Sequence, residues 1–244
     1  MNSLKQTILP LLLIFLTISV SAQSDRERNF SREFVWGIKK STTGGLISGF
    51  MFKYGMRRSE RQWQSFNLEL VNVKHPNESR ETSVITGEPF IWGKEHYLYA
   101  VRFQYGREYV LFEKADQQGV QVNLIGAAGP TLGFIAPYYI KYATDNQFNP
   151  VSEPYDPNNS AIRRSAVMGT GHLFQGLGQS DLTVGLSAKV AFSFEFSTFN
   201  SSISGFEVGF LVEAYPNEVI LMPAQNNRAI FNEVYITLTH GKRR

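Results

Sequence analysis

The sequence predicts an all-β fold, an eight-stranded antiparallel up-and-down transmembrane β-barrel spanning residues 23–244. Three observations lead to this prediction. Large apolar residues alternate with small or polar ones over long stretches, an export leader precedes these stretches, and the chain is rich in aromatic residues and poor in charge.

The composition narrows the class of protein. Of 244 residues, 19 are Phe, 11 are Tyr, 3 are Trp and 20 are Gly, and 18% are charged, against roughly 25% in an ordinary soluble domain. The absence of cysteine excludes a disulfide scaffold, a Cys-ligated zinc site, a thiol enzyme and a lipid-modified N-terminal Cys. Basic and acidic residues are nearly equal in number, and the net charge of only +3 does not indicate nucleic-acid binding.

Residues 1–22 have the pattern of a secretory signal peptide. Lys5 supplies a positive start, Ile8–Val20 is an apolar run of 13 residues, and small residues precede a cleavage site after Ala22. The run is short for a membrane-spanning helix, which needs about 20 apolar residues. An uncleaved N-terminal anchor is the alternative. We expect a mature chain of residues 23–244, exported to the outer membrane.

The clearest strand pattern lies at residues 182–197. Leu, Val and Phe side chains occupy one face, and Gly, Ser, Lys and Glu side chains occupy the other. Sixteen alternating residues are too many for a typical globular strand of about 5–6 residues. They suit a tilted membrane strand of roughly 9–11 residues with an extension beyond the bilayer. The small and charged residues then fill a narrow lumen, and Val184, Leu186, Val190, Phe192 and Phe194 face lipid.

Seven further segments repeat this alternation, which gives eight strands. The predicted ranges are 33–41, 46–56, 63–74, 95–106, 119–142, 181–197, 203–215 and 228–240. An even count places both termini on one side of the barrel. The connections 75–94 and 143–180 are the longest, so we expect their end of the barrel to face outward. Pro130 interrupts one predicted strand, and we expect an extension bent at Gly129-Pro130.

Several segments resemble a family of small outer-membrane β-barrels of Bacteroidota-type bacteria. They include Tyr105–Phe112, Ala128-Gly129-Pro130, Phe174–Gly178 and Glu213–Pro216. The resemblance covers most of residues 33–244. It implies an integral outer-membrane location and no particular substrate or catalytic residue.

Candidate chemistry is sparse, and the sequence predicts no catalytic, cofactor-binding or metal-binding residue. His75, His96 and His172 lie in or beside the long connections, and Ser79, Ser83 and Ser165 lie in the same regions, so a rim His–Ser pair is a geometric possibility. Solvated loop histidines are the simpler interpretation. Asp145, Glu153, Asp156 and Asn158 lack calcium-loop spacing, and Gly126, Gly129 and Gly133 lack the helix that a nucleotide fingerprint needs.

Charged residues within the predicted strands should pair in the lumen, because an unpaired buried charge is costly. The cations are Lys39, Lys53, Arg102 and Lys189, and the anions are Glu33, Glu69, Glu195, Glu207 and Glu233. Arg57, Arg58, Arg61 and Lys242–Arg244 form basic ends, which are either solvated or act as counter-charges for lipid headgroups or periplasmic partners.

Three functions remain open. The first is a structural or accessory outer-membrane barrel, for example a subunit of a larger envelope assembly, and a non-enzymatic role is favoured over an enzymatic one. The alternatives are a rim lipid-modifying enzyme and a narrow channel for small molecules. Outer-membrane lipid is the expected partner, with other outer-membrane or periplasmic proteins as further candidates. No nucleic acid or cofactor is expected.

Overall fold

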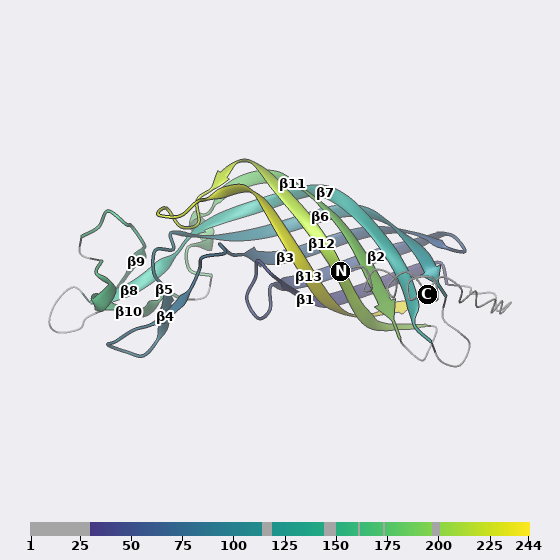
Figure 1. The fold of residues 1–244 in the computed structure, drawn as a ribbon, viewed down its shortest axis with the longest axis horizontal. Helices are drawn as coiled ribbons and strands as arrows, with labels where there is room; N and C mark the ends of the chain where they lie inside the picture. The colour runs from purple at the N-terminus through teal and green to yellow at the C-terminus, as the bar shows by residue number, and fades with distance from the viewer. Residues whose placement is uncertain (1–29, 114–118, 144–149, 161, 173, 197–200) are drawn as a thin grey trace, which may run out of the picture.

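The computed structural model describes residues 30–113, 119–143, 150–160, 162–172, 174–196 and 201–244. The signal peptide predicted at residues 1–22 lies outside these residues. Eight long strands form a closed barrel in the order β1-β13-β12-β11-β7-β6-β3-β2, and every neighbouring pair is antiparallel (Figure 1). The predicted fold class is confirmed. The strands are β1 (Arg32–Ser41), β2 (Gly49–Ser59), β3 (Gln62–Val73), β6 (His96–Phe112), β7 (Gln121–Pro137), β11 (Asp181–Glu195), β12 (Ser202–Val219) and β13 (Arg228–Arg243).

Two of the predicted strand boundaries are wrong. The segment 107–118 is not a connection throughout, because β6 continues to Phe112 and pairs with β3 as far as Tyr109. The predicted strand 119–142 ends at Pro137, and residues 139–143 form a separate short strand. The sequence pattern is two-residue alternation in both places, so periodicity alone does not show where a strand leaves the barrel.

The extension expected to begin at Gly129-Pro130 is also wrong, since both residues lie inside a continuous barrel strand. Pro130 pairs with Leu186 of β11, and its exposed ring faces outward from the barrel. The ladder to β6 omits only the two pairs at this position and resumes in the same register. A Cβ at Gly129 would lie 2.0 Å from the carbonyl oxygen of Phe103, so the chains approach closely where proline lacks its N–H.

The barrel has two unlike ends. The loop end carries a hairpin, β4 (Arg80–Thr82) with β5 (Pro89–Ile91), and a three-stranded sheet of β8 (Tyr139–Ala143), β9 (Pro150–Pro154) and β10 (Val167–Thr170). Figure 1 shows these small sheets together, opposite the end where the C-terminus lies. We call that opposite end the terminal end, because the first residues of β1 pair there with the last residues of β13. The expected grouping of the long connections at one end is confirmed.

The small sheets share a core of their own, which we call the loop-end module. The buried side chains come from both sheets and from the segments between them: Phe90, Tyr138, Ile140, Tyr142, Tyr155, Ile162 and Val167. Backbone bonds from Tyr155 N–H to the Tyr138 carbonyl (2.8 Å) and from Tyr138 N–H to the Glu95 carbonyl (2.7 Å) fasten it to the barrel. The long connections are therefore built into a packed structure.

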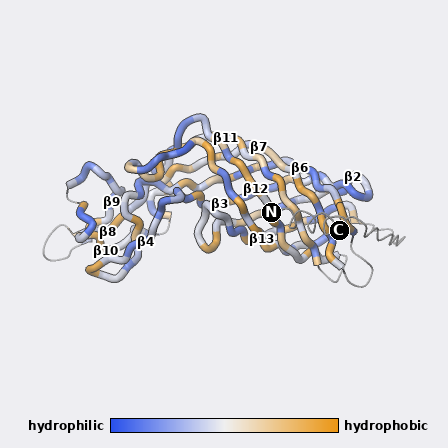
Figure 2. The backbone as a smooth tube through the Cα atoms, viewed as in Figure 1, coloured by the Kyte–Doolittle hydropathy of each residue, from blue (hydrophilic) through white to orange (hydrophobic). Residues whose placement is uncertain are grey.

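The barrel wall has the polarity of a membrane protein. Leu182, Val184, Leu186 and Val190 are each 59% exposed or more, and the alternating residues Gly185, Ser187 and Lys189 point inward and are buried. Figure 2 shows hydrophobic and hydrophilic residues alternating along the barrel strands. A soluble barrel would bury its large apolar residues, whereas here they cover the outside. No helix in the described part of the chain is long and apolar enough to cross a membrane.

Candidate functional site

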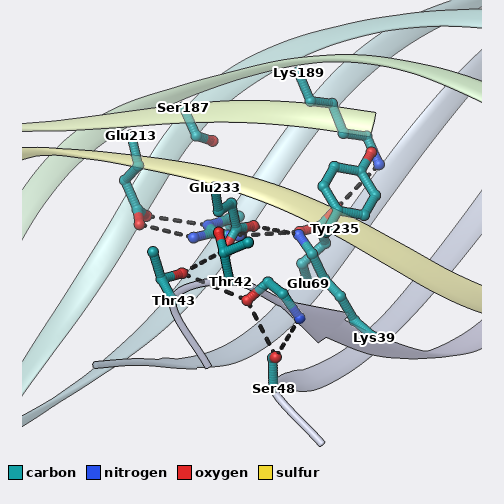
Figure 3. A network of polar contacts seen from close by, with 12 residues as sticks. Lys39, Thr42, Thr43, Ser48, Glu69, Ser187, Lys189, Glu213, Glu233 and Tyr235 are labelled. Atoms are coloured by element: carbon teal, nitrogen blue, oxygen red, sulfur yellow. Dashed lines mark hydrogen bonds and ion pairs between the residues drawn. The ribbon is translucent and has the colours of Figure 1, made fainter. Parts of the chain in front are cut away.

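Seven charged side chains meet in the middle of the lumen, and we call them the central network. Each comes from an inward-facing position of a barrel strand: Lys39, Glu69, Arg102, Lys189, Glu207, Glu213 and Glu233. Glu69 lies at the centre of this network, because its carboxylate forms ion pairs with Lys39 at 2.8 Å, Lys189 at 2.9 Å and Arg102 at 3.3 Å. Figure 3 shows Lys39 and Lys189 converging beside Glu69 and the ring of Tyr235.

Tyr235 joins the network through both its ring and its hydroxyl. The ammonium of Lys39 lies 4.0 Å from the ring centroid, a cation–π distance. The hydroxyl donates to Glu207, which also receives Lys189 at 3.0 Å. The ammonium of Lys189 lies 5.7 Å from the same ring centroid, so the ring faces both cations and the hydroxyl bonds to the carboxylate of Glu207.

A second group, the terminal network, lies nearer the terminal end. Glu33 receives Lys53 at 2.9 Å and Arg243 at 3.1 Å. Lys53 also reaches Glu108 at 3.0 Å, and Arg243 reaches Glu195 at 2.6 Å. The guanidinium of Arg243 lies 5.6 Å from the Trp63 ring. Lys53 and Arg243 are thus shared between carboxylates, which is what a narrow, low-dielectric lumen requires.

Apolar residues fill the lumen beside the networks. Toward the loop end they form one buried cluster: Val71, Val73, Leu98, Ala100, Tyr215, Val219, Leu221 and Phe231. A second buried cluster of Ile125, Ala191, Leu211 and Tyr235 adjoins the central network through Tyr235. Charged networks and apolar clusters together pack the described lumen with side chains, as expected for an eight-stranded barrel.

Every lumen charge predicted from the sequence points inward and has an oppositely charged partner. The prediction missed Glu108, Glu213 and Arg243. Glu108 was assigned to a connection, although Gly106, Glu108 and Val110 continue the inward alternation of β6. Arg243 was assigned to a basic end, and its inward position follows from extending the alternation of β13 to the end of the strand.

The structure does not bring the predicted histidine and serine candidates together at the loop end. His75 Nε2 lies 3.1 Å from the Asn226 carbonyl, and His96 Nδ1 lies 3.0 Å from the Ile220 carbonyl. Ser83 donates to the Val167 carbonyl at 2.6 Å and so ties β4 to β10. These groups hold loops in place, and no contact between His75, His96 or His172 and Ser79, Ser83 or Ser165 is found among the described residues.

A buried ion pair anchors the connection before β6. Lys94 is fully buried and donates to Glu78 Oε1 at 2.7 Å, and the same oxygen accepts the backbone N–H of His75 at 3.0 Å. The ammonium lies 4.3 Å from the Tyr97 ring centroid. Burial lowers the pKa of Lys94 below its ordinary value, and the attraction of Glu78 opposes that shift. The contacts are those of a structural clamp.

The acidic candidates of the long connection also have structural partners. Glu153 accepts the hydroxyl of Tyr142 at 2.8 Å, and Asp156 accepts the backbone N–H of Asn158 at 2.8 Å. Asp145 lies outside the described residues. Within the described ranges, no three His, Asp or Glu side chains are grouped so as to hold a metal ion. Gly126, Gly129 and Gly133 are strand residues of β7.

One serine–histidine contact occurs at a place the sequence did not indicate. Ser204 Oγ and His240 Nδ1 lie 3.0 Å apart on the outside of the barrel near the terminal end. The residues face each other across β12 and β13, and the His240 ring meets Trp36 edge-on at 5.9 Å between centroids. The alternation pattern places both residues on the outward faces of their strands, but only the register between β12 and β13 shows that they are opposite each other.

Comparisons with known proteins identify no family. No family model and no curated protein matches the chain. Among solved structures, it is similar to Ail, the attachment invasion locus protein of Yersinia pestis, at 10% identity and a TM-score of 0.37, over 88% of this chain and 99% of that one. It is also similar to Neisserial surface protein A at 11% identity and a TM-score of 0.33, over 88% and 95% of the two chains.

The candidate site is therefore described from the barrel itself. A transmembrane wall encloses a packed, ion-paired lumen, and one end carries a module with an independent core.

Proposed function

We propose that this protein is an outer-membrane β-barrel with a structural or accessory role, anchoring the loop-end module on the cell-surface side as part of a larger envelope assembly. The observation that carries the proposal is that a barrel with a packed lumen also has an ordered module at one end. An even-stranded antiparallel barrel with long loops at one end and both chain ends at the other is typical of outer-membrane proteins.

The packed lumen favours an anchor over a channel. The central network cross-links Lys39, Arg102 and Lys189 to carboxylates from several strands, and the apolar cluster around Leu221 lies between it and the loop end. A conducting path would have to break buried ion pairs.

The loop-end module favours a binding role. Arg164 forms two 2.6 Å bonds with Glu81, and Ser83 bonds to the Val167 carbonyl, so hairpin and sheet are joined. A preformed surface binds a partner with little ordering cost. This is the property expected of an assembly subunit.

Affinity capture from detergent-solubilised outer membranes tests the proposal. Full-length tagged protein should recover a stoichiometric partner. A variant in which residues 139–170 are replaced by a short Gly/Ser linker should lose it while remaining a folded, heat-modifiable barrel. The matched control is Arg58→Gln at the terminal end, which should retain the partner.

Two results would reject the proposal. Recovery of the protein in the soluble periplasmic fraction contradicts the anchor role. Capture of the same partner by the folded variant that lacks residues 139–170 contradicts the role of the module.

A further inference from the structure

A groove of about 800 Å³ runs along the outside of the barrel at the terminal end. It lies over β1, β2 and β13 and is distinct from the lumen and the loop-end module. Its lining combines three kinds of side chain: aromatic (Phe34, Trp36, Tyr54), imidazole (His240) and basic (Arg32, Lys242, Arg244).

The lining is graded along the strands. On the outward face of β13, Ile236 and Leu238 are followed by His240 and then Lys242 toward the terminal end. Strand β1 matches it, because Trp36 pairs with His240 and Phe34 pairs with Lys242. Aromatic residues mark the boundary between hydrocarbon and water in transmembrane barrels. The groove therefore crosses that boundary, with apolar surface on one side and positive charge on the other.

The side chains that line the groove carry an excess of positive charge. Glu33 is its one acidic lining residue, and that carboxylate is already bonded to Lys53 and Arg243 in the terminal network. In the part of the chain that the structure describes, no ion pair holds the side chains of Arg32, Lys242 or Arg244. Basic side chains beside aromatic rings suit an anion that carries an apolar tail.

His240 adds a directed donor. When the Ser204 hydroxyl donates to Nδ1 across their 3.0 Å contact, the proton of a neutral His240 ring resides on Nε2. The edge-on contact with Trp36 fixes the ring plane. Nε2 is then a hydrogen-bond donor for a phosphate oxygen in the groove.

We propose that this groove binds the headgroup of an anionic phospholipid of the periplasm-facing leaflet. The phosphate lies among Arg32, Lys242, Arg244 and His240, and the acyl chains continue over Phe34 and Trp36. The proposal rests on the proposed function in one respect, that the barrel spans the membrane with its loop end at the cell surface, and it is independent of any partner of the loop-end module.

Native mass spectrometry of the detergent-purified mature chain tests this site. Phosphatidylglycerol should remain bound, with phosphatidylcholine as the zwitterionic comparison. The triple variant Arg32→Gln, Lys242→Gln, Arg244→Gln should weaken phosphatidylglycerol binding at least about tenfold, since each basic residue contributes to attraction at an anionic surface. His240→Phe, which keeps an aromatic ring beside Trp36, should cause a smaller loss.

The matched control removes three positive charges from the same end outside the groove: Arg58→Gln, Arg61→Gln, Arg107→Gln. It should bind phosphatidylglycerol like wild type, and heat modifiability confirms that each variant is folded. Equal losses in both triple variants would show unspecific attraction and overturn the site.

Two further outcomes would also overturn the proposal. Full displacement of the lipid by millimolar inorganic phosphate would show a site for free phosphate. Lipid binding that appears only after deletion of residues 23–29 would show that the chain's own N-terminal segment occupies the groove.

Discussion

Arg102 meets Glu213 side-on in the centre of the lumen, through Nε to Oε1 at 3.2 Å and Nη2 to Oε2 at 2.8 Å. Its remaining Nη1 donates to Glu233 at 2.8 Å and Glu69 at 3.3 Å. One guanidinium thereby joins strands β3, β6, β12 and β13. The planar fork of arginine matches this arrangement, which a lysine ammonium cannot reproduce.

We expect Arg102→Met to destabilise the barrel by about 3–5 kcal/mol, because it leaves buried carboxylates without a partner. Denaturant unfolding in lipid vesicles, followed by tryptophan fluorescence, measures the loss. Arg164→Met is the matched control, since Arg164 makes a similar two-bond contact with Glu81 but is 64% exposed. Its effect should be about 0–1 kcal/mol. Equal effects would contradict the role of burial.

Val190 lies near the middle of β11 on the outward face, 59% exposed. Val190→Arg should cost about 2–4 kcal/mol if this depth is the bilayer midplane, whereas Met56→Arg, near the terminal end of β2, should cost about 0–1 kcal/mol. The same vesicle unfolding assay compares them. A smaller cost at Val190 than at Met56 would refute the assigned lipid-facing depth.

Tyr138 provides a pH test of the loop-end module. Burial raises the pKa of its phenol to about 12. The folded state therefore favours the neutral form, and the resulting stabilisation is complete below pH 10 and is lost as pH rises through about 12. NMR of Cζ-labelled tyrosine identifies the Tyr138 signal as the one that is absent in Tyr138→Phe, and this signal should titrate near pH 12. Titration of that signal near pH 10 would contradict the burial argument.

The packed lumen predicts an electrically silent barrel. Purified, heat-modifiable protein in planar bilayers should show no steady conductance of the porin kind, because ion pairs and apolar layers occupy the lumen. Reproducible large open-channel currents from folded protein would replace the anchor proposal with a channel. An open porin in the same bilayers checks the sensitivity of the measurement.

Much of the barrel could be predicted from the sequence because successive side chains of a β-strand point to opposite faces of the sheet. Alternation alone places Lys39, Arg102 and Glu69 inside and Val190 outside. It also indicates that lumen charges pair, although not which residues pair. Partners such as Lys39 and Glu233 are 194 positions apart, and they meet only because β1 closes on β13.

The missed features depend on long-range geometry. Pro130 predicts an extension beyond the barrel, but β7 continues through it, because the ladder to β11 includes Pro130 and the ladder to β6 resumes on either side of it. The loop-end module depends on aromatic residues from separate connections, including Phe90 and Tyr155, whose meeting leaves no local periodicity. The contact of Ser204 with His240 likewise requires the register of two strands.

The ion pairs across the seam have a consequence for barrel assembly. Lys39 and Glu33 lie on β1, whereas their partners Glu233 and Arg243 lie on β13, so these pairs form only when the first and last strands meet. In an open sheet entering the bilayer, each of these four charges would lack one of the partners that it has in the closed barrel. Closure and insertion should therefore be one cooperative event, which disfavours half-inserted intermediates.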